Sequence, residues 1–339
     1  MKKHEGFISI VILIVMVLSF IMLLYVVDIN KMQALTNFYS RDHDQSLYSS
    51  ESKLFLCIND EYYLEEKLKP ILFEIFRNPN TKPTESIKID PGDLEAGDSE
   101  DNLTLIYEEI EEDKCMKLVS KANIRGNITT TYLSASLVNE IYEMEIPIID
   151  VKALELSLSE SYIEEIKRLT HQIETNIDIK AMGERELIYA FQSDKYERVD
   201  LKANKLICTR EGMNIPYSEF INKKEVFLVF RALKDNYIDL YIDEVHNAKK
   251  LSGIIYVEGD LYIKKDFKFS GIIIIKGGNL FVEDDCSFDL EGMLIYTDHE
   301  KRHEIPDNLS IKYGSGTIYK YGTYIPDFLD IRVNSIKSY

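Results

Sequence analysis

The chain has 339 residues, of which 45% are hydrophobic and 11% aromatic, and it contains only 8 prolines. This length and apolar content suit about two packed domains and exclude extended disorder. Its 40 Lys and Arg against 58 Asp and Glu give a net charge of −18, which argues against nucleic acid as a partner because a phosphate backbone needs surplus cations.

The N-terminal segment carries the strongest signal in the sequence. Residues 7–27 contain no charged side chain. As a helix they span about 31 Å, the thickness of one bilayer core. A signal peptide would have a shorter apolar region followed by small residues, whereas Asp28 follows this run directly. Lys2 and Lys3 precede the run, so the positive-inside rule predicts a single pass through the cell membrane, with a cytoplasmic N-terminus and an extracellular C-terminal ectodomain.

The next residues predict an amphipathic helical stalk. No Pro or Gly occurs between Asp28 and Lys69, and Pro70 is expected to kink or end the helix. Apolar residues that recur at steps of three, four and seven indicate one buried stripe. They include Ile29, Met32, Leu35, Leu47, Leu54, Ile58 and Tyr62.

These N-terminal residues resemble those of a known family. The leader MKKHEG precedes a run that starts at Phe7, and the stalk contains the stretch Ser50-Glu51-Ser52-Lys53-Leu54. The pattern is similar to the N-terminal segment of type IV pilin-like proteins, most closely the PilX-type minor pilins and assembly proteins. The resemblance implies cleavage after Gly6 by a prepilin peptidase, with Phe7 as the first mature residue. Glu51 and Leu54 match the family's Ala-Glu-x-x-Leu stretch.

Two positions depart from the family pattern. Most pilins carry Glu at the fifth mature position, where this chain has Val11, and a helix-kinking Pro where it has Asp28. The Glu is also missing from some tip-located minor pseudopilins and from many PilX-like chains. Efficient processing of the leader is therefore an open expectation here.

The middle of the chain indicates mixed secondary structure. Residues 79–102 are rich in Pro, Gly and acidic side chains but contain no calcium-loop spacing, which predicts a solvated acidic linker. Residues 103–245 predict a mixed α/β ectodomain with one helix near 160–175. Strands are expected at 103–107, 115–119, 141–151, 187–191 and 226–230.

A repeat in residues 246–325 predicts a short β-solenoid. The segment from Gly253 to Asp266 aligns with that from Gly271 to Asp284, and a third unit starts at Gly292. Each unit is too short to bury itself, so we expect parallel stacking around a shared interior, with an antiparallel meander as the alternative. The repeat predicts structural roles for Gly253, Gly259, Gly271, Gly277 and Gly292.

Alternation along a strand makes a further expectation for the middle unit. Successive strand residues point to opposite faces. We therefore expect only one of Ile273 and Ile274 to face the solenoid interior, and the other to tolerate truncation.

Signals for catalysis are weak. The pentapeptide from His299 to His303 satisfies H-E-x-x-H, but Lys301 and Arg302 are charged and Pro306 follows closely. We expect an irregular loop there. No Walker loop, G-x-S-x-G or C-x-x-C is present, and the four cysteines lie too far apart for a zinc knot. Spacing leaves the disulfide pairing of Cys57, Cys115, Cys208 and Cys286 open. We expect no enzyme, no metal site and no cofactor.

The sequence thus predicts an α+β protein with two candidate functions. The first is a non-catalytic, membrane-anchored minor pilin that contributes to type IV pilus or pseudopilus assembly or surface display. Its expected partners are membrane lipid, other pilin-like subunits, the pilus assembly machinery and prepilin peptidase. The alternative is a single-pass cell-surface binding or structural protein with a β-solenoid ectodomain, unrelated to pili. The predicted order is a cytoplasmic leader (1–6), a transmembrane helix (7–27), a stalk (28–78), a linker (79–102), a mixed ectodomain (103–245), a solenoid (246–325) and a C-terminal tail (326–339).

Overall fold

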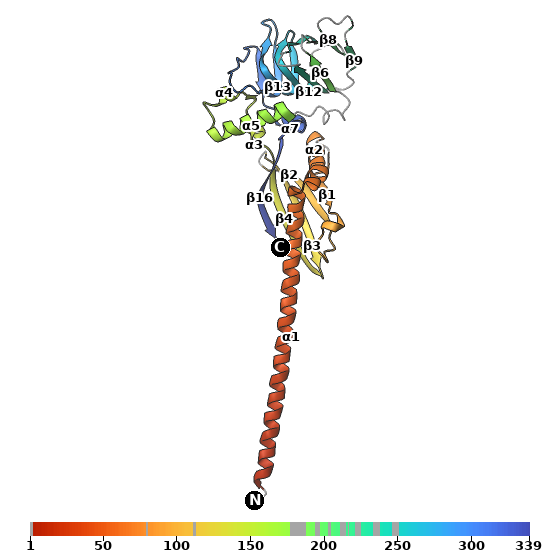
Figure 1. Ribbon diagram of the computed structural model, residues 1–339, viewed down its shortest axis with the longest axis vertical. Helices are drawn as coiled ribbons and strands as arrows, with labels where there is room; N and C mark the ends of the chain where they lie inside the picture. The colour runs from red at the N-terminus through yellow and green to blue at the C-terminus, as the bar shows by residue number, and fades with distance from the viewer. Residues whose placement is uncertain are drawn as a thin grey trace.

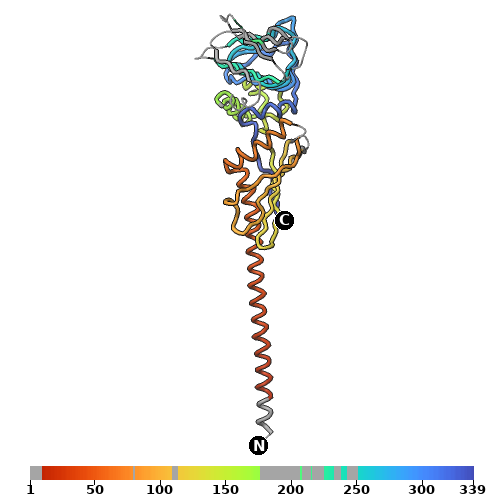
Figure 2. The backbone as a smooth tube through the Cα atoms, turned by 90° about the vertical axis from the view of Figure 1, so that its right-hand side faces the viewer, coloured from red at the N-terminus to blue at the C-terminus, as the bar shows by residue number. Residues whose placement is uncertain are grey.

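A computed structural model shows an elongated molecule. One long helix, α1, forms its lower half, an antiparallel sheet packs on the upper part of that helix, and a β-solenoid lies at the far end (Figure 1). A view turned by 90° shows the same order along the axis (Figure 2). The chain contains both helices and strands, so the predicted α+β class is confirmed. The structure describes residues 3–78, 81–110, 113–176, 188–193, 197–202, 205–210, 215, 217–220, 225–232, 238–245 and 251–339.

The helical stalk is continuous from the apolar run into the folded part of the molecule. Helix α1 spans Lys3–Asn59 without a break. A π-helical segment, Tyr62–Leu68, and helix α2, Lys69–Arg77, follow it. Pro70 lies in the first turn of α2, where the missing proline N–H has no helical partner to lose. The long helix therefore ends before Pro70, at the π-helical segment.

A five-stranded antiparallel sheet packs against the C-terminal part of α1. Its order is β1-β2-β3-β4-β16, and α1 crosses β3 and β4. The first and last strands correct two expectations, because β1 lies in the expected linker and β16 in the expected tail. Apolar side chains of both strands reach the core, among them Ile87 and Ile336. The strands are β1 Thr84–Lys88, β2 Asn102–Ile110, β3 Asp113–Ile124, β4 Asn127–Val138 and β16 Leu329–Ser338.

Short helices lie between this sheet and the solenoid. Helix α5 confirms the helix expected near 160–175. Of the strand expected over 141–151 only the two residues of β5 are extended, and the rest of that expectation is wrong. Asn139 and Asp150 explain the error, because their side chains accept hydrogen bonds from Ile141 N and Ala153 N and thereby cap two helical turns. The elements are α3 Glu140–Glu143, β5 Ile148–Ile149, α4 Val151–Leu154, α5 Glu160–Asn176 and α7 Ser315–Gly322.

The predicted β-solenoid is present and makes about 3 turns. Its strands stack in parallel, with β12 between β10 and β13 and with β14 on the far side of β13. The solenoid also draws on residues before 246, since β6, β7, β10 and β11 belong to the same sheet. Its parallel strands are β6 Ile188–Ser193, β7 Glu197–Lys202, β10 Glu225–Ala232, β11 Leu240–Val245, β12 Leu251–Ile263, β13 Phe267–Val282, β14 Phe288–Tyr296 and β15 Leu309–Lys312. The antiparallel strands β8 Lys205–Arg210 and β9 Tyr217–Phe220 extend the wall at β7.

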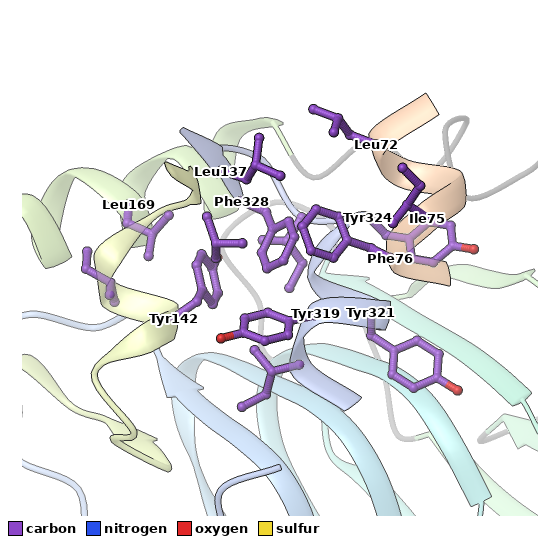
Figure 3. Close-up of a cluster of buried hydrophobic side chains, with 14 of the residues drawn as sticks. Leu72, Ile75, Phe76, Leu137, Tyr142, Leu169, Tyr319, Tyr321, Tyr324 and Phe328 are labelled. Carbon is purple, nitrogen blue, oxygen red and sulfur yellow. The ribbon is translucent and has the colours of Figure 1, made fainter. Parts of the chain in front are cut away.

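Two apolar cores share one wall of the solenoid. Ile273 belongs to the core inside the solenoid, whereas Ile274 belongs to a larger core that continues through the short helices to Leu54 of α1. Only Ile273 of the two faces the solenoid interior, as expected. Ile274 is also fully buried, so the expectation that it tolerates truncation loses its structural basis. Figure 3 shows part of the larger core, where the rings of Phe76 and Tyr319 converge between α2 and α7 with a centroid distance of 6.0 Å. The solenoid and the sheet are therefore joined by continuous packing.

Candidate interaction surfaces

The N-terminal part of α1 is bare. From residue 10 to residue 41 its side chains are exposed, and contacts with the sheet begin at Asp42. Among the described residues one helix, this one, is long and apolar enough to cross a membrane. Gly6 and Phe7, the predicted cleavage pair, lie inside the span of α1. Val11, the position of the missing Glu, is 42% exposed.

The bare region extends beyond the apolar run. Residues 28–41, which we call the stem, expose large apolar side chains although they lie past the charge-free segment. Exposed apolar stripes of this kind usually mark surfaces that bind a partner or a membrane. The stripe comprises Ile29, Met32, Leu35, Phe38 and Tyr39. Shallow grooves follow the same helix, one reaching from Tyr25 to Asn37 and the other from Asn37 to Tyr48 beside Glu95.

Polar side chains attach α1 to the sheet. Ser46 Oγ donates to backbone oxygens at the β3–β4 hairpin, 3.1 Å from both Ala122 O and Asn127 O. Ser50 Oγ lies 2.6 Å from Thr131 Oγ1 on β4. These serines are small, so the helix backbone approaches the sheet closely. The hydrogen bonds fix where along α1 the sheet begins.

A buried ion pair completes the attachment. Lys53 Nζ lies 2.8 Å from Asp98 Oδ2, and the two side chains are 1% and 0% exposed. Nζ also donates to Glu100 O and Lys121 O. Burial opposes ionisation of Asp98, but hydrogen bonds from Lys53, Ser49 and two backbone N–H groups outweigh it and lower its pKa. Sequence reasoning missed this pair, because Asp98 lay in the stretch expected to be a solvated acidic face.

The repeat glycines pair with one another between adjacent strands of the solenoid wall. Gly253 pairs with Gly271, Gly271 pairs with Gly292, and Gly259 pairs with Gly277, in the register of the aligned repeats. Gly253 has φ +140°, and a Cβ there would lie 1.8 Å from Val226 O. No other residue fits that position, since both the backbone angle and the contact exclude a side chain.

The H-E-x-x-H segment is irregular, as expected. His299 Nε2 hydrogen-bonds Thr170 Oγ1 of α5, whereas His303 is buried with Nδ1 3.1 Å from Asp150 Oδ2. The His303 ring stacks on Tyr296 at 3.9 Å. The two histidines thus contact different elements and do not share a helix face. No group of three candidate metal ligands occurs among the residues that were described.

Among the residues that the structure describes, Cys57 and Cys286 are free thiols. Cys57 and Cys115 are buried, and Cys286 lies at a corner of the solenoid. Burial raises the pKa of Cys57 to about 12, with Lys67 opposing the shift, so this thiol stays protonated at neutral pH. The side chain of Cys208 lies outside the described part of the chain.

Comparison with known proteins gives no match. No family model, no curated protein and no solved structure is similar to the chain. The functional argument therefore rests on the helix, the sheet and the solenoid themselves.

Proposed function

We propose that the protein is a non-catalytic, membrane-anchored pilin-like subunit, of the minor-pilin kind, that takes part in type IV pilus or pseudopilus assembly or surface display. One observation carries the proposal. A single helix has a bare apolar N-terminal half, and its C-terminal half packs on an antiparallel sheet. This arrangement suits a subunit that is first anchored in a membrane by its apolar helix and that later packs this helix against the helices of other subunits. The predicted partners are membrane lipid, other pilin-like subunits and the assembly machinery.

The stem favours this proposal over a plain membrane anchor. Residues 7–27 alone suffice to cross a bilayer. A plain anchor gains nothing from exposing Met32, Leu35 and Phe38 above the membrane, whereas a helix that packs among others buries them. The alternative, a cell-surface binding or structural protein unrelated to pili, leaves this stripe without a role.

Topology gives the first test of the proposal. Protease added to intact, wall-stripped cells is expected to digest residues 28–339, because the positive flank places the N-terminus inside. Immunoblotting with an antibody against the solenoid is the measurement. A cytoplasmic protein followed in the same cells serves as the control for lysis. Full protection of the ectodomain would contradict the proposed orientation.

Processing gives the second test and separates a pilin-like subunit from an anchor. The N-terminal sequence of the mature protein is expected to begin at Phe7. The chain that starts at Phe7 is expected to be absent from cells that lack prepilin peptidase. Gly6→Val should block cleavage, whereas Gly97→Val, in a loop of the ectodomain, should not. An intact Met1 in cells with active peptidase would contradict leader removal and favour the anchor.

A further inference from the structure

Helix α1 has an exposed face on the side opposite the sheet. Ser46, Ser50 and Lys53 are buried and hydrogen-bond the sheet. Between residues 44 and 59, by contrast, each exposed side chain lies three or four positions from the next. On a helix this spacing places the exposed side chains in one stripe. The stripe, which we call the back face, comprises Asp44, Tyr48, Ser52, Phe55 and Asn59, with Tyr62 at its upper end.

Aromatic rings recur along the back face at intervals of seven residues. Tyr48 is 69% exposed, Phe55 43% and Tyr62 51%. A seven-residue repeat keeps side chains in continuous contact with a second helix that runs nearly parallel, because two such helices supercoil to a shared period of about 3.5 residues per turn. The small side chains of Ser52 and Asn59 lie between the rings and leave room for that helix. The back face therefore fits a helix better than it fits a globular surface.

The groove at the lower end of the back face carries charges that complement themselves. It is lined by Arg41, Asp44 and Tyr48 of α1 and by Glu95 of the segment between β1 and β2. Arg41, Asp44 and Glu95 form no ion pair with a residue that the structure describes. A second copy of the chain brings the same cation and the same two carboxylates. The arginine of each copy can then lie between the carboxylates of the other.

Two copies in one membrane can meet along their back faces without obstruction. Both copies of α1 cross the membrane in the same direction, so equal residues lie at equal heights. When two back faces meet, the two sheets point outwards. Pairing through the apolar stripe of the stem would instead press the sheets together, since seven-residue steps from Met32 lead to Tyr39 and then to Ser46 on the sheet side. The unobstructed pair is a twofold dimer in which each back-face residue meets its own copy.

We propose that the back face of α1 binds the back face of a second copy of the chain, in a parallel twofold dimer. The inference goes beyond the proposed function, because any membrane-anchored chain with this face can pair in this way. It also leaves the stem stripe free for other helices. Confinement to one membrane raises the effective concentration of the second copy, so a modest contact of rings and small polar side chains suffices. Failure of leader cleavage would leave the dimer intact, so the two proposals are tested separately.

The test measures self-association of the full-length chain in neutral detergent micelles, by sedimentation equilibrium over a range of protein-to-detergent ratios. Phe55→Glu is expected to weaken dimerisation by about tenfold or more, because it removes a central ring and places two carboxylates opposite each other. Phe281→Glu is the matched control, since Phe281 is 42% exposed on the solenoid, and it should dimerise like the unmodified chain. Arg41→Glu should also weaken the dimer, and Arg41→Glu/Asp44→Arg should recover much of that loss.

Disulfide formation under mild oxidation tests the geometry of the pair. Ser52→Cys and Asn59→Cys are each expected to link to their own copy, because equal residues meet in a parallel twofold dimer. Met32→Cys, on the stem stripe, should not link. The unmodified chain, oxidised in the same way, measures the background from the native cysteines.

Four results would overturn the proposal. Equal dimerisation of Phe55→Glu and the unmodified chain would place the contact elsewhere. Linkage at Met32→Cys without linkage at Ser52→Cys would move the contact to the stem stripe. In a mixture of Ser52→Cys and Asn59→Cys chains, preferential linkage between the two kinds of chain would indicate an antiparallel pair. A monomer at every protein-to-detergent ratio would assign the back face to a different protein.

Discussion

Ile273→Ala and Ile274→Ala are each expected to destabilise the protein by about 2–5 kcal/mol, the usual cost of truncating a buried isoleucine. The two residues are neighbours on β13 and point to opposite faces. Ile273 packs inside the solenoid, and Ile274 packs in the core shared with α5 and α7. Because both side chains are fully buried, each truncation leaves a cavity that is closed to solvent.

Urea unfolding of the full chain in neutral micelles, followed by tyrosine fluorescence and far-ultraviolet circular dichroism, measures both effects. Ile128→Ala is the matched control, since Ile128 is 65% exposed on β4 and should change stability by about 0.5 kcal/mol or less. A large effect at Ile273 with a small one at Ile274 would show that the helices do not cover the outer wall. Small effects at both positions would contradict the stacked solenoid.

The register of the solenoid could be predicted because the sequence repeats it. Residues that align between the repeats also pair between the stacked strands, as Gly253 does with Gly271 and Gly271 with Gly292. Similar units bury one another best when they stack in register. What covers the outer wall could not be predicted from the repeat. A signal was nevertheless present in the four-residue apolar runs, because strands buried on both faces read as continuous rather than alternating. The run 272–275 therefore already indicated a covered wall.

Long-range pairing limited the prediction of the sheet. The first strand lies in a stretch rich in Pro and acidic residues, and the last begins about 190 residues after β4, the strand with which it pairs. Local patterns identify strands but not which distant strands pair. The segment 329–338 also has two register shifts, which interrupt its alternation of apolar residues. It therefore looked like a polar tail.

The attachment surface of α1 was missed for a different reason. Ser46, Ser50 and Lys53 lie at helical spacing on one face, but polar residues normally indicate a solvated face. Here their small or fully hydrogen-bonded side chains are buried instead. These three residues form a polar seam that can be recognised as buried only when its partners are known. Asp98, the partner of Lys53, is 45 residues away in the sequence.

Breaking the buried ion pair of the seam gives the second large effect. Lys53→Met is expected to destabilise the protein by about 3–5 kcal/mol, because it leaves the carboxylate of Asp98 buried without its cation. Lys53→Met/Asp98→Leu should recover much of that loss, since apolar residues of similar size often replace buried pairs at little cost. Lys69→Met removes a half-exposed pair with Glu65 and serves as the control, with an expected change of about 0–1 kcal/mol.

The pH dependence of the unfolding free energy tests whether the Lys53–Asp98 ion pair causes the loss of stability in Lys53→Met. Because the pKa of Asp98 is lowered in the folded protein, its contribution is complete above the unfolded value of about 3.9 and is lost as pH falls through the folded value. The unmodified chain should therefore lose stability below about pH 4, in addition to the loss that its other carboxylates cause. The double variant lacks the carboxylate, so acidification should lower the unfolding free energy of the unmodified chain more than that of the double variant. Lys53→Met should instead gain relative stability in acid, where Asp98 becomes neutral and its burial costs less. Parallel pH profiles for all three proteins would show that the pair is solvated and that the seam is held by its serines alone.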